Sequence, residues 1–188
     1  MKRLAFAAGA LLACTALIRV AAGTVTAAPG HFDSAFVQTR TIPGFKTPLV
    51  SYGVVHVDGV HGFRWQVNSP YHYVFLMQGD KAKELQPDGS VRELKSEDTP
   101  WLETVQHVFM AAMAGDQSEL RNYFHLKITR LTNGQQISMT PRTSAISAAI
   151  ESIQLIETTP GQPEQLLIKE KSGGRIDIRF HPEKHSGT

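Results

Sequence analysis

Beyond residue 30 the chain is dominated by a period-two alternation of apolar and polar residues. Phe63, Trp65 and Val67, for example, alternate with Arg64 and Gln66. Successive side chains of a strand point to opposite faces of a sheet, so this pattern predicts a strand with one buried face. A sheet built from many such strands must curl or split into two layers to cover its apolar face.

Further segments of this kind are joined by short connections. Pro87-Asp88-Gly89 and Asn133-Gly134 are typical of hairpin turns, because glycine tolerates the positive φ that such turns require. The whole pattern predicts about ten or eleven mostly antiparallel strands. The clearest of them lie at residues 35–42, 49–57, 62–68, 71–78, 126–130, 136–139, 153–157, 165–170 and 175–180.

One segment in the middle of the chain has helical periodicity instead. Between Pro100 and Gly115, apolar residues recur at intervals of three and four: Trp101, Leu102, Val105, Val108, Phe109, Ala112 and Met113. This spacing predicts an amphipathic helix over residues 101–113. Weaker signals predict a short helix at 117–123 and a last helical turn within 144–152.

The first 28 residues have the composition of an export signal. Lys2 and Arg3 precede an apolar run over residues 4–18, which is too short to span a bilayer comfortably. Small residues at 25–28 suit a signal peptidase, which needs small side chains before the cut. We therefore expect a signal peptide over residues 1–28, and a body over residues 29–188 that is exported to a bacterial periplasm.

A second interpretation of the same segment stays open. Residues 11–14 resemble a bacterial lipobox, in which Cys14 is acylated and becomes the mature N-terminus after removal of residues 1–13. The body would then be anchored to a membrane. The better small-residue site downstream favours soluble export. Because Cys14 is the single cysteine of the chain, an internal disulfide is excluded.

Length and charge narrow the classes of protein further. A chain of 188 residues with 41% hydrophobic and 19% charged residues is typical of one soluble globular domain. Three of the 19 basic residues and none of the 17 acidic ones lie in residues 1–28, which leaves 16 basic side chains against 17 acidic. This near-neutral body gives no electrostatic reason to expect nucleic acid.

The sequence carries no strong catalytic signature. The Gly-x-Ser-x-Gly elbow, the phosphate-binding glycine loop and the His-Glu-x-x-His pair are all absent from it. Among the eight histidines, His56 and His61 flank a short loop, but a metal site needs three or four converging ligands. We therefore expect no catalytic residues, no metal, no cofactor and no enzymatic activity.

The aromatic residues are crowded toward the N-terminal half of the body. Of the fourteen beyond residue 28, nine lie between Phe32 and Phe75. They could fill a solid core, which is the usual role of alternating aromatic residues in a β protein. They could also line a cavity that holds a ligand. The pattern alone leaves both alternatives open.

A series of short motifs points to a known family. The motifs are Phe36-Val37-Gln38-Thr39-Arg40, Pro48-Leu49, Gly53, Gly62-Phe63-Arg64-Trp65, Ser69-Pro70-Tyr71, Ala114-Gly115-Asp116, Leu120, Phe124, Met139-Thr140-Pro141-Arg142 and the closing residues 174–180. In this order, over about residues 32–180, the chain resembles the outer-membrane lipoprotein carrier (LolA-like) family of the bacterial periplasm, and within it a LolA-related subgroup.

The resemblance implies a particular fold. Members of this family form an unclosed, strongly bent antiparallel β-barrel with a helical lid over an apolar cavity, so the expected class is mainly β (α+β). One departure concerns the arginine and proline that family carriers place before their aromatic pair, where the arginine latches the lid. This chain has Val60-His61-Gly62 there. Arg40 or Arg64 could take the place of the latch.

The resemblance also implies a function and a site. It suggests a carrier or chaperone that binds acyl chains of lipoproteins, or another lipidated apolar molecule, as a monomer that receives cargo from an inner-membrane exporter and passes it to an outer-membrane acceptor. The alternative is an outer-membrane-anchored lipoprotein acceptor or a lipid-responsive sensor. The expected cavity residues are Phe36, Tyr52, Phe63, Trp65, Tyr73, Phe75, Met77, Val105, Phe109 and Met113.

Overall fold

The structure is a computed structural model that describes residues 31–58, 62–78, 81–94 and 102–181, and the side chains from residue 107 onward in the first helix. The expected signal peptide, Cys14 and the loop at 59–61 lie outside the described residues.

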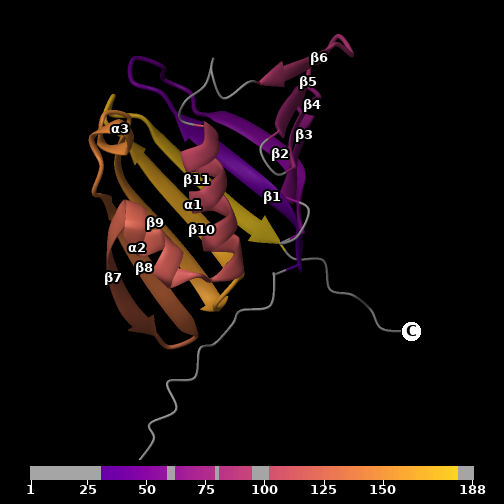
Figure 1. Cartoon of the computed structure of the whole chain (residues 1–188). Coiled ribbons are helices and arrows are strands. Elements are labelled where there is room, and N and C mark those ends of the chain that lie inside the picture. Colours follow the sequence, from indigo (N-terminus) through magenta and orange to yellow (C-terminus); the bar gives the residue numbers. More distant parts are fainter. Residues whose placement is uncertain (1–30, 59–61, 79–80, 95–101, 182–188) are drawn as a thin grey trace, which may run out of the picture.

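Eleven strands form one antiparallel sheet (Figure 1), in the order β6-β5-β4-β3-β2-β1-β11-β10-β9-β8-β7. The strands are β1 (His31–Thr41), β2 (Leu49–Asp58), β3 (Gly62–Ser69), β4 (Tyr73–Gln78), β5 (Lys81–Leu85), β6 (Val91–Leu94), β7 (Phe124–Leu131), β8 (Gly134–Pro141), β9 (Ile150–Thr159), β10 (Gln162–Glu170) and β11 (Arg175–His181). The two end strands, β6 and β7, are not paired with each other, so the sheet is unclosed, as expected from the sequence.

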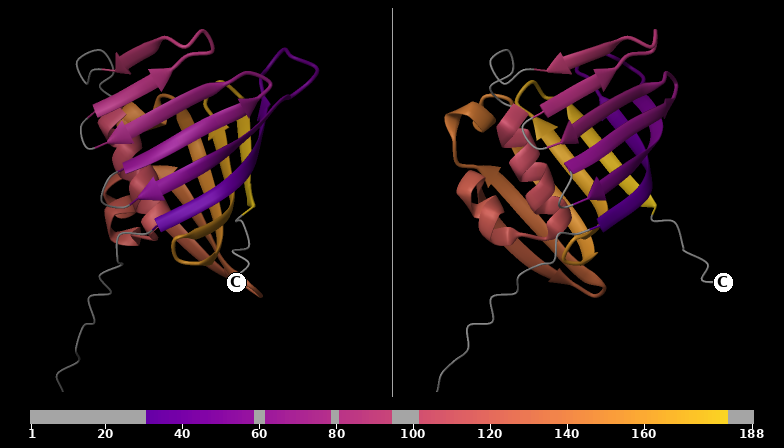
Figure 2. Two further views of the ribbon diagram at one scale, coloured as in Figure 1. Left: turned by 90° about the vertical axis from the view of Figure 1, so that its right-hand side faces the viewer. Right: turned by 45° about the vertical axis from the view of Figure 1, so that its right-hand side comes forward.

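The first and last strands meet at the centre of the sheet. β1 pairs with β2 on one side and with β11 on the other, where Phe36 lies opposite Phe180. Two meanders, β1–β6 and β7–β11, are thereby joined edge to edge. The combined sheet is strongly bent around its concave face (Figure 2).

Three helices connect the strands. Helix α1 (Leu102–Ala114) begins and ends one residue after the expected segment, and it lies against the concave face of the sheet (Figure 2). Helix α2 (Gln117–Tyr123) is capped by the Asp116 side chain, which accepts a hydrogen bond from the Glu119 backbone N–H at 3.0 Å. Helix α3 (Ser144–Ser147) is shorter than the expected turn at 144–152, because Ile150 already belongs to β9.

The end of α1 packs tightly against the turn between β9 and β10. Gly115 ends the helix with φ of +67°, and a Cβ atom at this position would lie 2.8 Å from the backbone of Pro160 and Gly161. Only glycine combines the positive φ with so close an approach of two backbones. The C-terminal end of α1 is therefore fixed to the sheet by main-chain packing.

The core lies between α1 and the concave face. Its fully buried side chains come from both meanders and from the helices, and include Phe36, Val55, Met77, Met113, Leu120, Phe124, Ile137, Met139 and Leu155. The alternation along the strands explains this arrangement, because every second side chain faces α1. None of the helices in the described part of the chain is both long and apolar enough to cross a membrane.

Candidate functional site

An apolar cavity of about 190 Å³ lies between α1 and the C-terminal meander. All the residues around it are apolar. They are Val108, Phe109, Ala112 and Met113 of α1, Phe124 of β7, Met139 of β8, Ile146 of α3, Ile150 and Ile153 of β9, and Leu166 and Ile168 of β10. A cavity with such a wall favours apolar contents over water.

The sequence builds this space from small and aliphatic side chains. Leu166 and Ile168 alternate with outward-facing residues on β10, and Met139 faces the same side from β8. On α1, Ala112 is 6% exposed and offers only a methyl group to the cavity. A small side chain at this position of α1 leaves space that a larger one would occupy.

On its other side α1 meets a packed group of aromatic rings. Phe109 lies against Phe63, with ring centroids 4.2 Å apart, and meets Trp65 edge-on at 6.3 Å. Trp65 in turn stacks on Phe36 at 4.0 Å, and Phe63 contacts Phe75 at 5.7 Å. We call these five residues the aromatic cluster. Its rings lie between α1 and the first meander.

The structure brings most of the expected site residues together, but only two of those with described side chains line the cavity. Phe36, Phe63, Trp65, Phe75 and Phe109 form the aromatic cluster, while Met77, Met113 and Tyr73 belong to the same core or pack against it. Phe109 and Met113 are the two that border the cavity. The side chain of Val105 lies outside the described residues.

Tyr52 is not brought to this site. Its neighbours Ser51 and Gly53 face the concave side, and Tyr52 points outward from β2 with 53% of its surface exposed. The ring of Phe36 comes so close to Gly53 that a Cβ atom there would lie 2.6 Å from it. The expectation that Tyr52 faces the cavity is therefore wrong. Tyr52 lies on the outward face of β2 together with the exposed His56.

Sequence reasoning missed the other nine residues around the cavity. Most of them come from the second meander and from α3, where aliphatic residues outnumber aromatic ones. The alternation of Leu166 and Ile168, and the repeat of Val108 and Ala112 on the helix, were visible signals of the inward face. The sequence did not show which inward residues border empty space.

Three hydrogen-bonded polar side chains lie among the apolar residues of the concave face, near its β6 edge. The Tyr73 hydroxyl donates to Glu84 Oε1 at 2.9 Å, and Gln86 Nε2 donates to Glu84 Oε2 at 3.0 Å. Burial, and then the hydrogen bond to the Glu84 carboxylate, raise the pKa of Tyr73 well above its ordinary value of 10.0. Tyr73 therefore stays protonated and holds Glu84 in place.

Glu157 is a fully buried carboxylate near the opposite end of the concave face. Gln135 Nε2 donates to its Oε1 at 2.6 Å, and the Gly161 backbone N–H donates to its Oε2 at 3.2 Å. Burial raises the pKa of Glu157 above its ordinary value, although both hydrogen bonds act in the opposite direction. The carboxylate ties the β9–β10 turn to β8, beneath the end of α1.

Neither arginine considered as a lid latch has a described contact with α1. Arg40 donates to Glu170 Oε1 at 3.0 Å, at the end of β10. Arg64 is exposed on the face of β3 opposite to Phe63 and Trp65. Within the described ranges, no group of three or more histidine, cysteine or acidic side chains could hold a metal ion.

None of the curated proteins matches this chain. Among solved structures, the chain is similar to a LolA superfamily protein from Nitrosomonas europaea, with 10% identity, coverage of 85% of this chain and 88% of that one, and a TM-score of 0.45. It is also similar to the Mycobacterium tuberculosis lipoprotein LppX, with 11% identity, coverage of 82% and 87%, and a TM-score of 0.39.

A family comparison covers nearly the whole body. The family described as outer membrane lipoprotein carrier protein LolA matches residues 30–187. The match includes the whole sheet, α1 and the cavity beneath it. With an unclosed antiparallel sheet wrapped around a helix and a family match over most of its length, the chain belongs to the LolA family.

Proposed function

We propose that this protein is a periplasmic carrier that binds acyl chains of lipoproteins, or of another lipidated apolar molecule, under α1 and transfers them toward the outer membrane. The observation that carries the proposal is the wholly apolar cavity between α1 and the second meander. Membership of the LolA family supports the same role. The proposed role involves no chemical reaction.

The length of an acyl chain determines how much apolar contact a carrier must provide. Exposing an acyl chain to water costs roughly 0.8 kcal/mol per CH₂ group, so a sixteen-carbon chain needs contacts worth on the order of 10 kcal/mol to cross an aqueous space. Side chains such as Ile153, Leu166 and Ile168 supply apolar contacts of this kind. Met113 and Met139 add flexible side chains that adapt to differently shaped tails.

The volume of the cavity shows whether an acyl chain can bind without a rearrangement of α1. An engineered cavity of about 150 Å³ binds benzene, so a cavity of about 190 Å³ accepts a group of that size without rearrangement. A sixteen-carbon chain needs more room. Phe109 lies between the cavity and Phe63 of the first meander, so a shift of α1 that withdraws this ring would lengthen the apolar space.

We further propose that residues 1–28 direct export, and that the body receives cargo from an inner-membrane exporter and delivers it to an outer-membrane acceptor. Intact-mass spectrometry of the protein from its native host tests the first point. A mature chain that starts near residue 28 or 29 supports a soluble carrier. A mature chain that starts at an acylated Cys14 supports the membrane-anchored acceptor or sensor instead.

The cavity itself is tested by lipid extraction and by uptake of an apolar fluorescent dye. Ala112→Phe adds a ring where α1 offers only a methyl group, so it should abolish dye uptake and remove bound lipid while the protein stays folded. Thr129→Phe adds a ring to an exposed position on β7 and serves as the matched control. Equal uptake by both variants, or no lipid and no dye in the unmodified protein, would refute the proposal.

A further inference from the structure

A strip of exposed apolar side chains lies outside the cavity, along the β1–β2 hairpin and the neighbouring β3–β4 turn. It consists of Phe45, Leu49, Val50, Tyr52 and Tyr71, which are 66%, 54%, 39%, 53% and 56% exposed. These five are most of the large exposed apolar residues in the described part of the chain. Apolar side chains gathered in this way mark a surface that contacts another body. We call these five residues the hairpin strip.

The hairpin presents Phe45 on an ordered turn. The Phe45 backbone N–H donates to the Ile42 carbonyl at 3.1 Å, and Gly44 has φ of +86°. This turn projects from the body of the protein (Figure 2). Along β2 the strip continues through Tyr52. On the neighbouring strand, Ser69 lies opposite Tyr52, and Tyr71 follows Ser69 by two residues. Val50 and Tyr52 thus share the outer face of β2, whereas Leu49, which lies opposite Arg40, is on the concave side at the start of the same strand.

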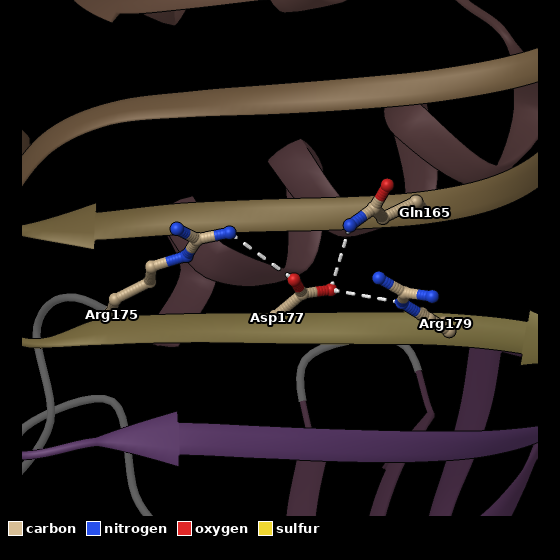
Figure 3. A network of polar contacts seen from close by, with 4 residues as sticks. All are labelled: Gln165, Arg175, Asp177 and Arg179. Atoms are coloured by element: carbon tan, nitrogen blue, oxygen red, sulfur yellow. Dashed lines mark hydrogen bonds and ion pairs between the residues drawn. The ribbon is translucent and has the colours of Figure 1, made fainter. Parts of the chain in front are cut away.

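Basic side chains flank the strip on the outer face of the sheet. Asp177 accepts contacts from Arg175 Nη2 at 3.3 Å, Arg179 Nε at 3.8 Å and Gln165 Nε2 at 2.8 Å (Figure 3). Two guanidinium groups therefore share one carboxylate. Lys169 lies opposite Arg175 on β10 and adds a further positive charge.

The sheet register places this basic flank next to the strip. Val37 of β1 lies between Tyr52 and Arg179, and Thr39 lies between Val50 and Asp177. Only one strand therefore separates the outward apolar residues of β2 from the arginines of β11. Tyrosine and phenylalanine beside exposed arginine and lysine form the combination that suits a bilayer interface, where rings reach the acyl boundary and cations meet lipid phosphates.

We propose that the hairpin strip and its basic flank dock the protein on the surface of an anionic phospholipid bilayer. Phe45, Val50 and Tyr52 enter the interface, and Arg175 and Arg179 pair with the headgroup phosphates. Docking of this kind would hold the carrier at a membrane while cargo enters or leaves. The proposal goes beyond the carrier function and does not depend on the cavity.

Co-sedimentation with vesicles tests the proposal. The full chain is mixed with vesicles of phosphatidylcholine and phosphatidylglycerol, with phosphatidylcholine vesicles alone, and with the mixed vesicles at high salt. We expect binding to the mixed vesicles that falls at least fivefold at high salt or without the anionic lipid. Phe45→Glu with Tyr52→Glu should weaken binding at least tenfold. Any contribution of residues 1–30 is the same in every variant.

Leu131→Glu is the matched control, because Leu131 is also an exposed apolar residue (41%) but lies at the far end of β7. It should bind vesicles like the unmodified protein. Equal binding by the strip variant and the control would overturn the proposal. Vesicle binding that does not depend on anionic lipid or on salt concentration would also overturn it. Concentration-dependent self-association that the strip variant abolishes, without vesicle binding, would assign the strip to a protein contact and also overturn it. Dye uptake in solution should be unchanged in all these variants, which separates this test from that of the cavity.

Discussion

The ring of Phe109 lies against the ring of Phe63 with centroids 4.2 Å apart, and the same Phe109 side chain borders the apolar cavity. One residue of α1 thus divides the concave side of the sheet into two parts. The first meander contributes an aromatic part, and the second contributes an aliphatic part that holds the cavity. Withdrawal of this ring would join them.

Replacing Phe109 with alanine should therefore enlarge the binding space. We expect Phe109→Ala to lower the free energy of unfolding by about 3 kcal/mol, because a partly buried ring is lost, and to increase the uptake of long-chain fluorescent fatty acids. Phe109→Leu keeps an apolar side chain and should have smaller effects on both. Chemical denaturation and a fluorescence titration measure the two quantities. Unchanged or weaker uptake by the alanine variant would show that Phe109 does not limit the space.

The close approach of α1 to the β9–β10 turn can be tested at its glycine. Gly115→Ala places a Cβ atom 2.8 Å from the backbone of Pro160 and Gly161 and strains a positive φ. Gly89→Ala strains a similar φ of +82° but meets no atom within 4 Å. We expect a loss of about 1 kcal/mol for Gly89→Ala and at least about 2 kcal/mol for Gly115→Ala. Similar losses in urea denaturation would argue against tight packing at the end of α1.

The buried carboxylate of Glu157 should make stability depend on pH. Its pKa is higher in the folded protein than the usual 4.5, so the folded state binds more protons than the unfolded state. The stabilisation from protonation is complete below the unfolded pKa and is lost as the pH rises through the folded value.

Glu157→Gln removes this titration while keeping the shape of the side chain. The unfolding free energy of the unmodified protein, minus that of the variant, should therefore decrease as the pH rises from about 4 to about 8. Denaturant titrations at several pH values measure this difference. A constant difference across that range would mean that Glu157 is not buried in the way described.

The pairing of Arg40 with Glu170 predicts that Arg40 is not a lid latch. The Arg40 side chain is 44% exposed, so its ion pair is screened by solvent, and Arg40→Ala should cost less than about 1 kcal/mol of stability. Dye uptake should stay the same, because among the described side chains Arg40 contacts Glu170 of β10 and none of α1. A large change in the rate of dye uptake would show that Arg40 controls the movement of the lid.

Much of the fold could be predicted from local patterns. The alternation around Trp65 and the three-and-four spacing around Phe109 each reflect how one element buries its own apolar face, so the sequence shows them directly. The outward direction of Tyr52 was not predictable in this way, because its face of β2 also carries Val50 and Val54, while the inward face carries Ser51 and Gly53.

The position of the cavity was not predictable in the same way. Large rings such as Trp65 and Phe63 suggested a ligand site, but large rings are also the side chains that best fill the space beside a helix. The hollow lies instead where Ala112 faces Ile153 and Leu166 across the second meander. Which inward residues are left without a partner depends on where α1 lies across the sheet, and that is a long-range property of the fold.

The gap in pairing between β6 and β7 has a mechanical consequence. In a closed barrel every strand is held on both sides, and the circumference changes only if hydrogen bonds break. Here the two outermost strands can separate or approach while all ten ladders between neighbouring strands stay intact. The sheet can thus change the width of its concave side without breaking a ladder, which would let the proposed carrier hold cargo of different thickness.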